Sequence, residues 1–80
     1  MTGQNFTALI HFEGKAMHAA VLPKMRPDGM HYEVNIPGYP RFFMRWGVTD
    51  RFEPVGPAAR EIPDGLMLAV SDAIEERGRR

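Results

Sequence analysis

The sequence predicts an α+β fold: a four-stranded antiparallel meander followed by one C-terminal helix that packs on one face of the sheet. Apolar and polar residues alternate over most of residues 6–48, short turn sequences interrupt the alternation, and a helical apolar spacing appears only after residue 63. Because the 80 residues contain no repeat or linker, we expect a single domain over residues 1–80.

The first hairpin is expected to join strands at about residues 6–12 and 16–25 through Glu13 and Gly14. Glycine readily adopts the left-handed conformation that a two-residue hairpin loop requires. On the face selected by this loop, every cross-strand pair is apolar, as a sheet with one buried face demands. These pairs are Ile10 with Met17, Ala8 with Ala19, and Phe6 with Val21.

The second hairpin leads to a third strand at about residues 30–36 through residues 26–29, with the sequence Arg-Pro-Asp-Gly. Proline suits the second position of a type I turn, aspartate the third, and glycine the left-handed residue that closes it. The pairs that follow are Val21 with Val34 and Ala19 with Ile36. Both turns therefore select the same inward residues of the second strand.

The connection around residues 37–39 permits two registers for a fourth strand at about residues 40–48. A two-residue loop would direct Arg41 and Arg45 into the core. A three-residue loop avoids this, and a bulged turn costs less than burying two unpaired guanidinium groups. The preferred register places Phe42, Met44 and Trp46 inward, paired with Val34, Tyr32 and Met30, and Arg41, Phe43 and Arg45 outward.

Beyond this strand the pattern weakens, and whether residues 51–55 form a short fifth strand stays open. Pro54 would restrict such a strand to the edge of the sheet, because proline has no backbone N–H to donate. Residues 56–62 are expected to be an extended connection.

The helix is expected at about residues 64–77, with Asp64 as its N-terminal cap and Gly78 as its end. Helical spacing gives it one apolar stripe, which faces the sheet. The stripe consists of Leu66, Ala69, Val70, Ala73 and Ile74.

The composition restricts the function classes. Ten basic and ten acidic residues balance, unlike the basic excess typical of a dedicated nucleic-acid binder, and there is no cysteine. No stretch reaches the roughly 18 apolar residues of a membrane span, and the N-terminus lacks a signal-peptide pattern. We expect a cytoplasmic protein that binds no membrane and no cofactor.

The three histidines do not form a metal site in these registers. His11 and His18 are expected on the outer face of adjacent strands, whereas His31 lies opposite Lys24, roughly 20 Å from His18 at about 3.3 Å per residue. The residues around the first two offer no third ligand. We therefore interpret all three as surface histidines.

Catalytic groupings are also missing from the pattern. Ser71, the only serine, falls on the helix, and Thr2, Thr7 and Thr49 have no base and orienting group beside them. Glu13 and Glu33 lie on different parts of the sheet, which does not support an acid–base pair. We do not expect an enzyme.

The outer sheet face is the main candidate surface. Its candidate binding residues are Arg41, Phe43, Arg45, His31, Glu33, Leu9 and Leu22. Three of these residues, Leu9, Leu22 and Phe43, are apolar, and a group of apolar side chains on a surface indicates contact with a partner. An open sheet also leaves two edge strands with unpaired backbone groups. We expect a small interaction module that forms a homodimer or docks a protein partner through this face or an edge.

The alternative is single-stranded nucleic-acid binding, in which bases would stack on Phe43 between Arg41 and Arg45. A competing interpretation is that Glu33 forms cross-strand salt bridges with both arginines. A third hypothesis, a small-ligand site between helix and sheet near Trp46 and Tyr32, has no specific support in the sequence.

Overall fold

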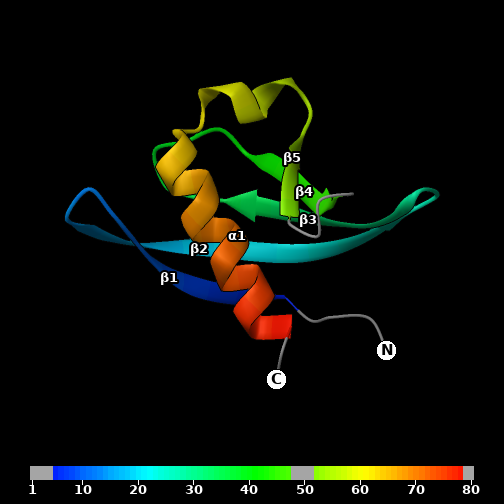
Figure 1. The fold of residues 1–80 in the computed structure, drawn as a ribbon, viewed down its shortest axis with the longest axis horizontal. Helices are drawn as coiled ribbons and strands as arrows, with labels where there is room; N and C mark the ends of the chain where they lie inside the picture. Colours follow the sequence, from blue (N-terminus) through cyan, green and yellow to red (C-terminus); the bar gives the residue numbers. More distant parts are fainter. Residues whose placement is uncertain (1–4, 48–51, 79–80) are drawn as a thin grey trace.

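The computed structural model describes residues 5–47 and 52–78. They form one antiparallel sheet in the order β1-β2-β3-β4-β5, with α1 lying across one face (Figure 1). The predicted α+β class, meander topology and packed C-terminal helix are confirmed. The elements are β1 (Phe6–Phe12), β2 (Lys15–Arg26), β3 (Gly29–Asn35), β4 (Phe42–Trp46), β5 (Phe52–Val55), the 3-10 helix η1 (Pro57–Glu61) and α1 (Asp64–Gly78).

The first two hairpin registers are those that the turn residues predict. Ile10 lies opposite Met17, and Val21 opposite Val34. In the first loop both residues have positive φ, 51° at Glu13 and 76° at Gly14, as a type I′ turn requires.

The third connection follows the longer of the two loops. Val34 pairs with Phe42, which keeps Arg41 out of the core. The backbone N–H of Tyr39 donates to the carbonyl of Ile36 at 3.1 Å, and Gly38 has a φ of 89°. With proline before this glycine, the segment has the character of a type II turn.

The fifth strand, left open by the sequence, exists and lies on the edge of the sheet, as the proline at position 54 implied. Two expectations about the C-terminal half are corrected. Residues 57–61 form the 3-10 helix η1 instead of an extended segment. Asp64 lies in the first turn of α1 rather than capping it, because the carbonyl of Pro63 accepts the first helical hydrogen bond, from the N–H of Met67 at 3.0 Å.

The core lies between α1 and the inner sheet face. The predicted stripe of the helix packs there, with Leu66 and Val70 fully buried against Phe42 and Met44. The hairpin of β2 and β3 extends past the helix in Figure 1. Trp46, predicted to point inward, is the last residue of β4 and is 50% exposed.

Candidate functional site

Five of the candidate binding residues form one cluster on the outer face. The register places Leu22, Glu33 and Phe43 side by side on β2, β3 and β4. In the next row of the same face, His31 lies beside Arg45. Arg41 is exposed just before β4, and Leu9 lies apart on β1.

The ring of Phe43 is half-buried because another side chain covers it. The guanidinium carbon of Arg26 lies 5.1 Å from the ring centroid, which is cation–π geometry. Arg26 is the last residue of β2, and its side chain crosses β3 to reach this ring. In the sequence Arg26 is recognised only as a turn residue, and it is not among the predicted candidate binding residues.

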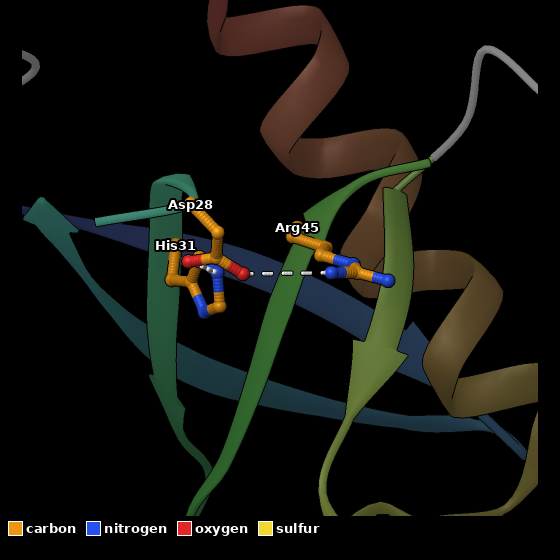
Figure 2. Close-up of polar contacts among 3 residues, drawn as sticks. All are labelled: Asp28, His31 and Arg45. Atoms are coloured by element: carbon orange, nitrogen blue, oxygen red, sulfur yellow. Dashed lines mark ion pairs between the residues drawn. The ribbon is translucent and has the colours of Figure 1, made fainter. Parts of the chain in front are cut away.

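His31 is buried, with 6% of its surface exposed, so its interpretation as a surface histidine is wrong. Asp28, on the adjacent turn, lies over it: Figure 2 shows this carboxylate between the imidazole of His31 and the guanidinium of Arg45. Nε2 of His31 is 3.2 Å from Oδ1 of Asp28, yet the angles do not make a hydrogen bond and this buried nitrogen has no aligned partner.

Asp28, and not Glu33, is the ionic partner of Arg45. Nη1 of Arg45 lies 3.6 Å from Oδ2 of Asp28, with both side chains about half exposed. The carboxylate of Glu33 instead accepts a hydrogen bond from Nδ2 of Asn35 at 2.9 Å. Exposed pairs of this kind contribute little to stability, so the Asp28–Arg45 contact can open at small cost.

A hollow of about 310 Å³ opens where β3 and β4 separate. The last pair of their ladder is His31 with Arg45, so Trp46 does not pair with Met30 as expected. The hollow is lined by Asp28, Gly29, Met30, His31, Tyr32, Arg45, Trp46 and Phe52. It matches the region of the small-ligand hypothesis only in part, since it lies at the end of the sheet rather than beneath the helix.

The free edge of β1 is the second notable feature. Leu9, at the middle of this strand, is 56% exposed. A hollow of about 230 Å³ lies along the strand beside the last turn of α1, where the guanidinium of Arg77 sits 4.8 Å from the Phe6 ring centroid. In Figure 1 this last turn reaches past β1.

The remaining candidates lie outside this cluster. His11 and His18 are exposed on the outer face, and Thr7 is exposed on β1. Ser71 is buried on α1, and its Oγ has no hydrogen-bond partner. Thr2 and Thr49 lie outside the described residues.

Across residues 5–47 and 52–78, no three His, Asp or Glu side chains are grouped closely enough to hold a metal ion. In the same part of the chain, no helix has the length and apolar character needed to cross a membrane.

Comparison with known proteins gives no relative: no protein-family model, no curated protein and no solved structure matches the chain.

Proposed function

We propose that the chain is a small non-enzymatic interaction module that forms a homodimer by pairing β1 with β1 of a second copy. The observation that carries this proposal is the free edge of β1, whose residue pattern is complementary to itself. As part of the same proposal we place the module in the cytoplasm, since a chain without cysteine fits a reducing compartment.

The two edges of the sheet differ in how they are protected. β5 has four residues, and one of them is Pro54, which has no N–H to offer to another strand. β1 has seven residues, with no proline, no glycine and no Asp, Glu, Lys or Arg. Sheet proteins usually protect a free edge with such residues, so an edge without them favours pairing with another strand.

The tight turn after β1 determines which backbone groups are free. A two-residue loop makes its flanking pair, Phe12 with Lys15, a hydrogen-bonded pair, and such pairs recur at every second residue. Along β1 the intervening residues are Thr7, Leu9 and His11. Their N–H and C=O groups therefore point away from β2, toward the open edge.

An antiparallel pair centred on Leu9 uses all of these groups. Leu9 then lies opposite its own counterpart, and Thr7 lies opposite His11 of the second copy. On the inner face Phe6 comes opposite Phe12 of the second copy, and both rings are only partly buried in one chain. The strand thus matches aromatic with aromatic at both ends and apolar with apolar at the centre.

Exposure at the centre of the strand supports the same arrangement. The two Leu9 side chains would lie next to each other on the outer face, each removing the other's apolar surface from water. Such an interface is isologous, so it closes after two copies and leaves only the proline-containing edges free.

Sedimentation equilibrium of the wild-type chain and two lysine variants tests this proposal. We expect a wild-type dimer and a monomeric Leu9→Lys variant, because two like charges would meet at the twofold axis. Leu68→Lys is the matched control, since Leu68 is similarly exposed but lies on α1. A monomeric wild type, or a Leu9→Lys variant that dimerises as well as the control, would refute the proposal.

The alternative, single-stranded nucleic-acid binding by Arg41, Phe43 and Arg45, has less support. Arg26 occupies the outward side of the Phe43 ring, where a base would have to stack.

A further inference from the structure

We propose that the hollow between the ends of β3 and β4 binds a small aromatic carboxylate. In this site the carboxylate of the ligand lies between His31 and Arg45, and its ring lies against the indole of Trp46. The inference is independent of the β1 dimer, because the hollow and β1 share no lining residue.

The size of the hollow limits the ligand. Its volume of about 310 Å³ lies at the lower end of small-molecule sites, which begin at roughly 300 Å³. A compound with one ring and one carboxylate fits this volume. The apolar lining and the few convergent polar groups are typical of ligand sites.

The buried imidazole supplies the first polar group. His31 lines the hollow, and its Nε2 is buried beside Asp28 without an aligned hydrogen bond, in a residue that is more than nine-tenths buried. Leaving such a nitrogen unsatisfied destabilises a fold, and its presence calls for a partner. A ligand oxygen that takes the place of the Asp28 carboxylate provides one.

The position for a carboxylate is already marked by Asp28. Its two oxygens face His31 and Arg45 at 3.2 and 3.6 Å, longer than the roughly 2.7–2.9 Å of charge-assisted hydrogen bonds (Figure 2). The aspartate therefore occupies the place of an anion without making its best contacts. It is half exposed on a turn, so a free carboxylate can displace it and bind the guanidinium with two hydrogen bonds.

Three aromatic rings hold the apolar wall in place. The Phe52 ring packs edge-to-face on both neighbours, with centroids 5.3 Å from Tyr32 and 5.0 Å from Trp46. This packing fixes the indole while half of its surface stays exposed. A rigid, accessible ring is suited to stacking against a planar ligand. The contact between two aromatic rings is more favourable in free energy than the burial of their apolar area alone would give.

The fluorescence of Trp46 can report binding in this hollow, because Trp46 is the only tryptophan in the chain. Benzoate is titrated while tryptophan emission is followed, and benzylammonium serves as a cation of similar size. We expect a saturable change with benzoate and none with benzylammonium. Arg45→Gln should weaken benzoate binding by about tenfold or more, through loss of a charged hydrogen bond.

The decisive variant is Asp28→Asn, which removes the competing carboxylate and should tighten benzoate binding. Arg41→Gln is the matched control: it removes an exposed arginine that does not line the hollow, and should leave binding unchanged. Absence of saturable benzoate binding to both the wild type and Asp28→Asn would overturn the proposal. Benzylammonium binding that Asp28→Asn abolishes would overturn it as well. Leu9→Lys should still bind benzoate, which separates this result from the outcome for the dimer.

Discussion

The guanidinium of Arg26 lies 5.1 Å from the centre of the Phe43 ring, two strands away across the outer face. Asp28, at the tip of the same hairpin, reaches His31 and Arg45. Both charged side chains of this turn therefore fold back over the sheet. Together they cover the part of the outer face that otherwise has the character of a stacking platform.

This cover predicts no affinity for single-stranded nucleic acid. A labelled oligonucleotide of mixed sequence should show unchanged fluorescence anisotropy on addition of the protein at low salt. Binding that falls steeply as salt rises, and that is lost in Arg41→Ala, would contradict this prediction and favour the nucleic-acid hypothesis.

Substitutions of two leucines on α1, one buried and one exposed, should differ in their effect on stability. Leu66 has no exposed surface, so Leu66→Ala should lower the free energy of unfolding by about 2–5 kcal/mol, through lost burial and the cavity left behind. Leu68 is 49% exposed, and Leu68→Ala should change it by no more than about 0.5 kcal/mol. Urea unfolding at one fixed protein concentration measures both, since the stability of a dimer depends on concentration. Equal losses would contradict the placement of α1.

Ser71→Ala should stabilise the protein by up to about 1 kcal/mol. The hydroxyl of Ser71 is buried without a hydrogen-bond partner, and alanine has the higher helix propensity. Thermal unfolding compares the variant with the wild type. A lower melting temperature would show that the hydroxyl has a stabilising partner.

A substitution in the first hairpin loop should also increase the stability of the protein. Glu13 adopts a φ of 51°, which is unfavourable for most residues other than glycine and asparagine. Glu13→Asn should raise the free energy of unfolding by up to about 1 kcal/mol. Glu13→Val, at the same position, should lower it, because a branched side chain is strained at positive φ. The opposite order in urea unfolding would contradict the turn assignment.

The sheet was predictable because its information is local. Two-residue turns fix registers, and the alternation on each side of Gly14 and Gly29 selects one buried face without knowledge of the rest of the chain. The choice of the third register needed only the cost of burying Arg41 and Arg45. The fifth strand stayed open and η1 was missed, since short segments rich in proline carry little periodic signal.

The candidate site was less predictable because it depends on contacts between side chains. Strand alternation places His31 on the outer face, and a residue there is normally exposed. Its burial results from the side chain of Asp28 lying over it, a conformation that no sequence pattern specifies. The hollow likewise depends on where the β3–β4 ladder stops, one pair before Trp46 would meet Met30.

The dimer across β1 is tested most directly by single cysteines in this otherwise cysteine-free chain. In the proposed register the two Leu9 Cα atoms lie about 5.5 Å apart, within the 4.4–6.8 Å span of a disulfide. Leu9→Cys should therefore oxidise to a covalent dimer. Thr7→Cys and His11→Cys should each stay monomeric alone, since each is roughly 13 Å from its own counterpart, but should cross-link when mixed.

Gel electrophoresis without reductant, after mild oxidation at low protein concentration, gives the readout. The predicted result is that Leu9→Cys cross-links with itself. Thr7→Cys and His11→Cys are predicted to cross-link only when the two variants are mixed. A Thr7→Cys variant that cross-links with itself as readily as Leu9→Cys does, or no cross-linking in any of them, would contradict pairing through β1.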